Sequence, residues 1–161
     1  MPQTPYDISQ LKKLEEIKVK ELMKPLVEGL IDAKTPITNM IDLMTYTQKK
    51  RVFYVVEGNK IIGILDPYRI LQYILLKTGR TTTLKEEPVG LRFLLGTTAK
   101  DYIGPLITLK PEDTAIEAAK KMVENRREEL PIISEEGKLM GEISFIDILN
   151  QAITLIQRPN R

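Results

Sequence analysis

The sequence contains neither cysteine nor histidine among its 161 residues. Without cysteine the chain can form no disulfide, no zinc–thiolate site and no thiol nucleophile. Without histidine it lacks the commonest general base and metal ligand of proteins. An enzyme would have to work with carboxylates, Lys, Tyr, Ser or Thr, and no nucleophile stands beside a base in any recognisable pattern. We therefore expect a protein that is not an enzyme.

The chain also has no excess of either charge and no long apolar run. Lys and Arg number 24 against 22 Asp and Glu, for a formal net charge of +2. The basic clusters Lys49-Lys50-Arg51 and Arg126-Arg127 lack the interleaved aromatics of a nucleic-acid surface. No apolar stretch approaches the roughly 18–20 residues of a membrane span, and the first residues do not resemble a signal peptide. We expect a cytoplasmic protein that binds neither membranes nor nucleic acids.

What the sequence does contain is one pattern that occurs twice. The first copy is Arg51-Val-Phe-Tyr-Val-Val-Glu-Gly-Asn-Lys-Ile-Ile-Gly-Ile-Leu65, and the second is Glu129-Leu-Pro-Ile-Ile-Ser-Glu-Glu-Gly-Lys-Leu-Met-Gly-Glu-Ile143. A repeat of this length predicts two similar units packed together, with any ligand site at their boundary. Each copy spans only about 60 residues and would be marginally stable alone, so we expect the two to share one core.

Hydrophobic periodicity predicts the same order in both copies: a strand, a helix, a two-stranded hairpin and a helix. In the first copy these are a strand near 27–31, a helix from Thr35-Pro36, a hairpin of 52–56 and 61–65 around Gly58-Asn59, and a helix from Asp66-Pro67. In the second they are a strand over 106–109, a helix from the capping box Thr114-Ala-Ile-Glu117, a hairpin of 130–134 and 139–144, and a helix from Ser144. The inward positions expected on the two helices of the second copy are Ile116, Ala119, Met122 and Val123, then Ile148, Leu149, Ala152, Ile153 and Ile156.

Five segments follow from these boundaries. They are an N-terminal helical arm (1–18), repeat 1 (19–77), a linker (78–98), repeat 2 (99–156) and a polar tail (157–161). The arm should form an amphipathic helix over 7–18 that Asp7 caps, packing on this chain or on a second copy. The linker is long for a compact domain, and a helical turn is expected within it at 89–95.

Three stretches of the second repeat closely resemble the cystathionine-β-synthase (CBS) domain, whose tandem pair is called a Bateman module. They are Pro111-Glu-Asp-Thr-Ala-Ile-Glu-Ala-Ala-Lys-Lys-Met122, Leu130-Pro-Ile-Ile-Ser-Glu-Glu-Gly-Lys-Leu-Met-Gly141 and Ile143-Ser-Phe-Ile-Asp-Ile-Leu149. The resemblance extends more weakly over residues 19–156. It implies an α+β fold of two β-α-β-β-α repeats, related by a pseudo-twofold axis and packed through their sheets. The clefts of such pairs typically bind adenine nucleotides or other adenosyl ligands, and the pairs often dimerise.

The family's ribose motif, Gly-x-x-Ser/Thr-x-x-Asp, corresponds to Gly141-Glu-Ile-Ser144-Phe-Ile-Asp147. The Asp147 carboxylate can accept hydrogen bonds from both ribose hydroxyls, and Ser144 lies at a helix N-terminus that favours anions. The same two residues also form a good helix cap, and both roles are compatible. The first repeat has Asp66 and Arg69 in their places, and arginine cannot accept from a sugar hydroxyl. We expect one adenosyl site per chain.

By family position the base would stack on Ile107 and Thr108, with Ile103 and Pro131 nearby, although Ile107 equally suits a core position. The phosphates would meet Lys50 and Arg51, with Arg127 as a further candidate; cations at an exposed helix end are the alternative. Near the ribose motif, Glu142 would join Glu128 and Glu129 in repelling a polyphosphate.

These residues favour AMP over ATP, or the cationic S-adenosylmethionine. We expect a small regulatory sensor that binds an adenosyl ligand between its repeats, acts as a homodimer and signals to an unidentified partner protein. The alternative is a ligand-free dimerisation module, which the altered motif of repeat 1 and the acidic residues of repeat 2 would suit.

Overall fold

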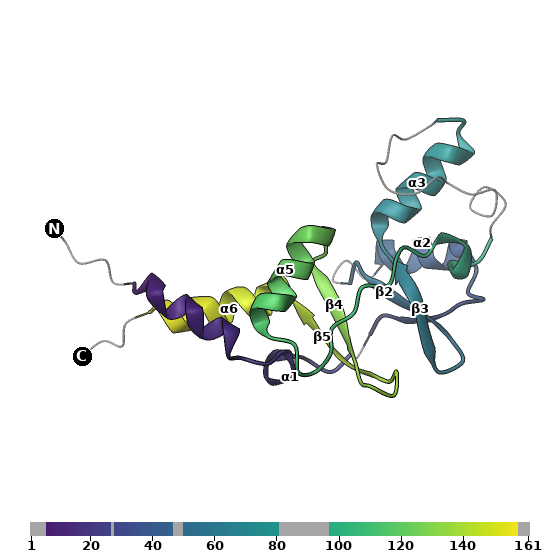
Figure 1. The fold of residues 1–161 in the computed structure, drawn as a ribbon. Coiled ribbons are helices and arrows are strands. Elements are labelled where there is room, and N and C mark those ends of the chain that lie inside the picture. Colours follow the sequence, from purple (N-terminus) through teal and green to yellow (C-terminus); the bar gives the residue numbers. More distant parts are fainter. Residues whose placement is uncertain (1–5, 27, 47–49, 81–96, 158–161) are drawn as a thin grey trace. The chain divides into compact units, whose positions relative to one another are not determined.

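The protein divides into two compact units, seen in a computed structural model that describes residues 6–26, 28–46, 50–80 and 97–157 (Figure 1). Unit 1 comprises Met1–Leu26 and Ile107–Arg161, and unit 2 comprises Val27–Leu106. The units therefore do not coincide with the sequence repeats. Residues 19–26, which open repeat 1, belong to unit 1, and residues 99–106, which open repeat 2, belong to unit 2. Each unit combines most of one repeat with the first segment of the other.

Unit 2 contains a three-stranded sheet in the order β1-β2-β3. Strand β1 (Leu30–Asp32) runs parallel to β2 (Phe53–Glu57), which pairs antiparallel with β3 (Lys60–Leu65). The hairpin β2–β3 is the one that the sequence predicts, and its turn residue Gly58 has φ +62°, a backbone conformation that glycine adopts without steric penalty. The other elements of this unit are α2 (Ile37–Tyr46), α3 (Pro67–Lys77) and the short 3₁₀ helix η2 (Ala99–Tyr102).

Helix α3 begins at Pro67 as predicted, and the Asp66 carboxylate accepts a hydrogen bond from the Arg69 backbone N–H at 3.2 Å. Helix α2 begins at Ile37, one residue later than the sequence suggests. The Pro36 carbonyl accepts from the N–H of Met40 at 3.3 Å, so Pro36 lies just outside the helix rather than at its first position.

Unit 1 is built on one hairpin and several helices. Strands β4 (Glu129–Ile133) and β5 (Leu139–Ser144) pair antiparallel, as predicted. The helical elements are η1 (Ile8–Glu15, 3₁₀), α1 (Val19–Leu22), α5 (Ala115–Asn125) and α6 (Phe145–Ile156).

The strand predicted over 106–109 is reduced to a single parallel bridge between Leu109 and Ile132. Leu109 donates to the Pro131 carbonyl at 2.9 Å and accepts from the Ile133 N–H at 2.8 Å. The next hydrogen bond of a parallel ladder, toward Ile107, would need a donor at position 131. Proline has no N–H, so the ladder ends there and the expected strand does not form.

The N-terminal arm packs on its own chain. Its helix is of the 3₁₀ type, and the Asp7 carboxylate caps it by accepting from the Ser9 N–H at 3.2 Å. Leu14 is buried, and η1 lies beside α6 (Figure 1). The Asp7 N–H also donates to the Ile156 carbonyl at 2.8 Å, which joins the start of the arm to the end of α6.

Among the described residues, buried apolar side chains form two clusters, one in each unit, rather than the single shared core that the sequence suggested. The segment contributed by the other repeat completes each cluster. Ala99 and Tyr102 are fully buried in unit 2, and Val19 is fully buried in unit 1. The remaining buried members are Ala33, Ile37, Met40, Phe53, Val55, Leu65 and Ile70 in unit 2, and Leu109, Ala118, Met122, Leu130, Ile132, Ile143 and Ile148 in unit 1.

The predicted inward face of α5 is partly wrong. Met122 is buried and Ala119 packs against the core, but Ile116 is 39% exposed and Val123 is 79% exposed. The buried positions are instead Ala115, Ala118 and Met122. On α6, Ile148 is buried as expected, whereas Leu149 and Ile153 are exposed.

The turn predicted at 89–95 lies outside the described residues. Within the ranges that the structure describes, no helix is both long and apolar enough to cross a bilayer.

Candidate functional site

The N-terminus of α6 holds the two residues predicted to bind ribose. Ser144 is the N-cap, and its hydroxyl accepts from the Asp147 N–H at 3.3 Å. In return, Asp147 Oδ2 accepts from the Ser144 N–H at 2.8 Å and from the Ser144 hydroxyl at 2.9 Å. These reciprocal bonds are a capping box. The helix-cap interpretation of this motif is therefore confirmed.

Asp147 does more than cap the helix. The residue is only 9% exposed, and its second oxygen, Oδ1, lies 2.6 Å from Nζ of Lys24. The Lys24 side chain is 67% exposed. Its backbone is fixed against β5, because the Lys24 N–H donates to the Glu142 carbonyl at 2.9 Å and the Glu142 N–H donates back at 3.0 Å. Sequence reasoning missed Lys24, since no local pattern links it to a helix so far along the chain.

The ion pair shifts both pKa values. Burial alone would raise the pKa of Asp147, but the hydrogen bond from Lys24 and those from Ser144 outweigh it, so this pKa lies below the ordinary value of 3.8. The hydrogen bond to Asp147 raises the pKa of Lys24 above 10.5, and the charges of Asp147 and Glu142 act in the same direction. Both groups are therefore charged at neutral pH.

The first residue of the motif, Gly141, has a structural role. A Cβ atom at this position would lie 2.5 Å from the Lys24 carbonyl oxygen and 3.4 Å from Sδ of Met23. Only glycine lets the segment containing Lys24 pass this close to β5. The glycine thereby positions the lysine that reaches Asp147.

Of the four residues predicted to lie around the base, Ile107, Thr108 and Pro131 belong to unit 1. Pro131 is fully buried and stands opposite Glu142 in the β4–β5 register. Ile107 is half-buried and packs against the core of unit 1, which agrees with the core interpretation. The carbonyl of Thr108, also half-buried, accepts from Nζ of Lys121 at 2.9 Å.

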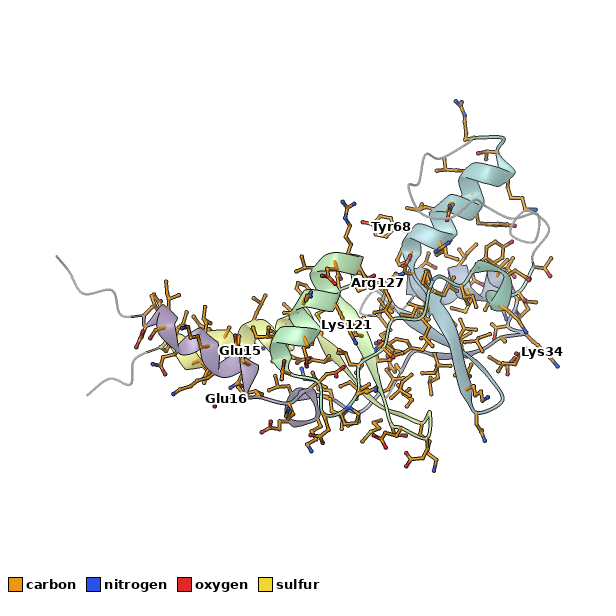
Figure 2. The ribbon with its side chains drawn as sticks, in the orientation of Figure 1. Glu15, Glu16, Lys34, Tyr68, Lys121 and Arg127 are labelled. Atoms are coloured by element: carbon orange, nitrogen blue, oxygen red, sulfur yellow. The ribbon has the colours of Figure 1, made fainter. Side chains whose placement is uncertain are left out.

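Two basic residues labelled in Figure 2 lie at helix α5: Lys121 is on the helix, and Arg127 lies just beyond its end. The Arg127 N–H donates to the Met122 carbonyl at 2.9 Å, so the backbone of Arg127 closes the end of α5. Arg127 itself is half-buried.

Ile103, Lys50 and Arg51 belong to unit 2 and not to the unit that contains Asp147. Ile103 lies against Gly63, where an added Cβ would be 2.6 Å from the Ile103 Cβ. Lys50 is 9% exposed, and its Nζ lies 5.6 Å from the ring centroid of Tyr54. This cation–π contact gives Lys50 a structural role that the sequence did not predict. Arg51 is exposed, and Lys49 lies outside the described residues.

The three acidic residues differ in exposure. Glu128 is exposed, whereas Glu129 and Glu142 are half-buried. All three lie beside the motif through their backbones: the Glu128 carbonyl accepts from the Phe145 N–H at 2.9 Å, Glu129 stands opposite Ser144, and Glu142 pairs with Lys24. The charge of Glu142 also raises the pKa of Lys24. The negative charge of Glu142 beside the motif is accompanied by the positive charge of Lys24.

Unit 2 repeats this arrangement with different side chains. Its β3 residue Ile64 exchanges backbone hydrogen bonds with Gly104 at 2.7 and 3.5 Å, as Glu142 does with Lys24 in unit 1. The position of Lys24 is thus taken by Gly104, and the position of Asp147 by Arg69. At these two positions the described residues of unit 1 form an ion pair, whereas those of unit 2 are a glycine and an arginine.

Comparison with known proteins identifies the class to which these repeats belong. The family model of the CBS domain matches the chain twice, over residues 19–76 and 99–153. The chain therefore belongs to the CBS-domain family and contains a tandem pair, which confirms the resemblance and the α+β fold.

Among its relatives, protein SDS23 of Candida albicans is 29% identical over 89% of this chain. The chain spans only 23% of that relative's length.

Solved structures share the fold. A CBS domain-containing protein of Thermotoga maritima has a TM-score of 0.67 at 22% identity, covering 84% of this chain and 93% of the other. CBSX2, solved in complex with AMP, has a TM-score of 0.67 at 17% identity, with 86% and 97% covered. The CBS domain of a bacterial CNNM/CorC family Mg²⁺ transporter, solved with ATP, has a TM-score of 0.65 at 17% identity, with 91% and 94% covered.

Proposed function

We propose that the protein is a regulatory, non-catalytic module that binds an adenosyl ligand at the N-terminus of α6 and passes the signal to a partner protein. The observation on which this rests is the buried state of Asp147. In α5, the carboxylate of Glu117 accepts from the Thr114 N–H at 2.7 Å and forms an equivalent capping box while exposed. A cap therefore needs neither burial nor a lysine partner, and Asp147 has both.

The chemistry of the site suits a ribose. A buried carboxylate at a helix N-terminus can accept from two vicinal hydroxyls, and such charge-assisted bonds are about twice as strong as neutral ones. The complexes of CBSX2 with AMP and of the transporter domain with ATP support an adenine nucleotide as the class of ligand. We favour AMP over ATP because Glu142 adds a negative charge beside the motif, with S-adenosylmethionine as the alternative.

We also infer that the chain acts as a homodimer. Helix α6 leaves a row of apolar side chains exposed, namely Phe145, Ile146, Leu149 and Ile153. A second copy with the same surface would cover such a row in an isologous contact. Sedimentation velocity should give a dimer, and Leu149→Glu should shift it to monomer; a wild-type monomer at every concentration would contradict this.

A ligand-free dimerisation module remains the second candidate, and one observation favours it. Asp147 already has partners on both oxygens, from Ser144 and from Lys24. A carboxylate that is satisfied within the chain has no need of a ligand.

Titration calorimetry and thermal shift with AMP, ADP, ATP, NADH and S-adenosylmethionine separate the two candidates. A ligand that binds the folded state raises the melting midpoint. Asp147→Asn keeps an acceptor for Ser144 but removes the charge, and loss of a charged hydrogen bond, worth about 1.5–3 kcal/mol, should weaken binding roughly 10- to 100-fold.

Two matched controls accompany this variant. Glu117→Gln alters the equivalent box in α5, and Arg69→Ala alters the corresponding position in unit 2; both should bind as the wild type does. If no compound of the panel binds the wild type, the sensor proposal is contradicted, and a dimer in sedimentation velocity would then support the dimerisation module.

A further inference from the structure

The ammonium of Lys24 occupies the carboxylate oxygen that a sugar would need. We propose that Lys24 competes with the ligand for Asp147. The Lys24 ammonium must leave Asp147 before ribose can bind, and Lys24 thereby favours adenosyl ligands that have a phosphate. This inference rests on the proposed function and names the residue that determines its specificity.

The hydrogen-bonding capacity of Asp147 shows why release is required. A carboxylate offers about four lone-pair sites, two on each oxygen. Oδ2 uses both of its sites on the N–H and the hydroxyl of Ser144, and Oδ1 uses one on Lys24 at 2.6 Å. One site remains, whereas a vicinal diol donates two hydrogen bonds. The Ser144 bonds hold the start of α6, so Lys24 is the partner that can leave.

The Lys24 ammonium can leave Asp147 without disturbing the fold. Its side chain is 67% exposed, so the ammonium can return to water. Its backbone stays in place through the two hydrogen bonds to Glu142 and the close approach at Gly141. Lys24 also lies near the end of the segment of unit 1 that leads directly into unit 2 at Val27. A change at Lys24 therefore acts where the chain passes from one unit to the other.

The released ammonium determines which ligand is favoured. Adenosine would occupy Asp147 but offer the ammonium no anion in exchange. AMP provides a phosphate, to which lysine binds as a point charge. S-adenosylmethionine would bring a second cation close to the ammonium, which is unfavourable. The expected order of affinity is AMP, then adenosine, then S-adenosylmethionine.

The equivalent positions of unit 2 are consistent with this role. Gly104 stands where Lys24 stands, and Arg69 stands where Asp147 stands. The position that corresponds to Asp147 has no carboxylate in unit 2, and the position that corresponds to Lys24 has no cation.

Salt dependence gives a distinctive test, because adenosine is uncharged. Its binding should not depend on salt unless an ion pair in the protein must break first. Salt screens this pair through the exposed side of Lys24, although less than it would screen a fully exposed pair. The wild type should therefore bind adenosine more tightly as salt rises about tenfold, from roughly 0.05 to 0.5 M. Lys24→Met should bind adenosine roughly 3- to 10-fold more tightly, without salt dependence, and its preference for AMP over adenosine should fall about tenfold.

Lys20→Met is the matched control. It removes the same charge from the same segment, but Lys20 pairs with Glu112 instead of Asp147. It should bind both ligands as the wild type does. Lys24→Arg should retain the salt dependence. In ligand-free protein, the pKa of the Asp147 carboxyl, followed by NMR, should rise in Lys24→Met and stay unchanged in Lys20→Met.

The outcomes separate the two claims. If wild type and Lys24→Met both bind AMP and show the same adenosine affinity and salt dependence, Lys24 is no competitor and the proposed function still holds. If neither binds any adenosyl ligand, both claims are overturned. An unchanged Asp147 pKa in Lys24→Met overturns the inference without reference to ligands, because the ion pair then does not exist in solution.

Discussion

Replacing Gly141 with alanine tests whether the segment containing Lys24 crosses β5 as the structure shows. The new Cβ would lie 2.5 Å from the Lys24 carbonyl oxygen, whereas ordinary van der Waals contact begins near 3.4 Å. The obstacle is backbone and not a flexible side chain. The crossing segment would therefore have to move away by about 0.9 Å, the difference between these two distances.

The expected loss of stability follows from what that movement breaks. The segment is held by two backbone hydrogen bonds to Glu142, at 2.9 and 3.0 Å, and each contributes about 0.5–1.5 kcal/mol. Inserting a methyl group into a packed site costs about 1–3 kcal/mol. Since the two effects overlap, we expect Gly141→Ala to lower the free energy of unfolding by about 2–4 kcal/mol. For a chain of this length that is a fall of roughly 4–16 °C in Tm.

Urea unfolding followed by circular dichroism measures this loss as a lower midpoint at unchanged slope. Gly63→Ala should cost a similar amount in unit 2, since its Cβ would lie 2.6 Å from the Ile103 Cβ and 3.0 Å from the Gly104 carbonyl oxygen. Gly137→Ala is the control for glycine loss alone. It has φ +83° and nothing within 4 Å, so only the backbone strain of about 1 kcal/mol applies. If Gly141→Ala is no less stable than Gly137→Ala, the segment containing Lys24 does not cross β5 at Gly141 as described.

Three further outcomes are expected. Because the pKa of Asp147 is lowered in the folded state, its contribution to stability is complete above the unfolded pKa of 3.8 and is lost as the pH falls through the folded pKa. In urea melts, the stability of Asp147→Asn should therefore decline less steeply below about pH 4 than that of the wild type. Equal declines in the two proteins would refute this. Burial, with smaller effects of neighbouring groups, raises the pKa of Tyr102 from 10.0 to about 12. The free energy of unfolding should therefore fall by on the order of 2 to 3 kcal/mol as the pH rises through this range. A Tyr102→Phe variant that loses the same stability at alkaline pH would rule out this cause. Met122→Ala removes a buried side chain and should lower the free energy of unfolding by about 2–5 kcal/mol, whereas Val123→Lys should change it by no more than about 0.5 kcal/mol. Equal losses would mean that the inward face of α5 is misassigned.

Features that depend on a few neighbouring residues could be predicted from the sequence. The hairpin turns contain glycines with positive φ, and such turns are decided by two or three residues. The capping boxes that open α5 and α6 are likewise decided within four residues. For the same reason the cap of α6 was predicted together with its possible use as a ribose site, since both follow from Ser144 and Asp147.

Features that depend on distant partners could not be predicted. The strand expected over 106–109 fails because its neighbour has Pro131 at the position that would donate the next bond. The face of α5 was misjudged because hydrophobicity marks Val123 as a core residue, while the packing of unit 1 selects Ala115 and Ala118. The cation–π contact of Lys50 with Tyr54 was not predicted, because no local pattern links the two residues.

The exchange of first segments accounts for the paired glycines of the repeat. Gly63 and Gly141 are each the point on the second hairpin strand where the opening segment of the other repeat passes within contact distance. The sequence showed these glycines as part of a repeat. Only the fold shows why glycine is needed there, because another segment of the chain crosses the strand at this point. Since both units require this crossing, the glycine is the same in both, whereas the residue at the crossing differs. Lysine is present where the following helix has a carboxylate, and glycine where it has an arginine. The two units thus share this backbone arrangement and differ in the charges placed on it, and on our proposal those charges determine what Asp147 can bind.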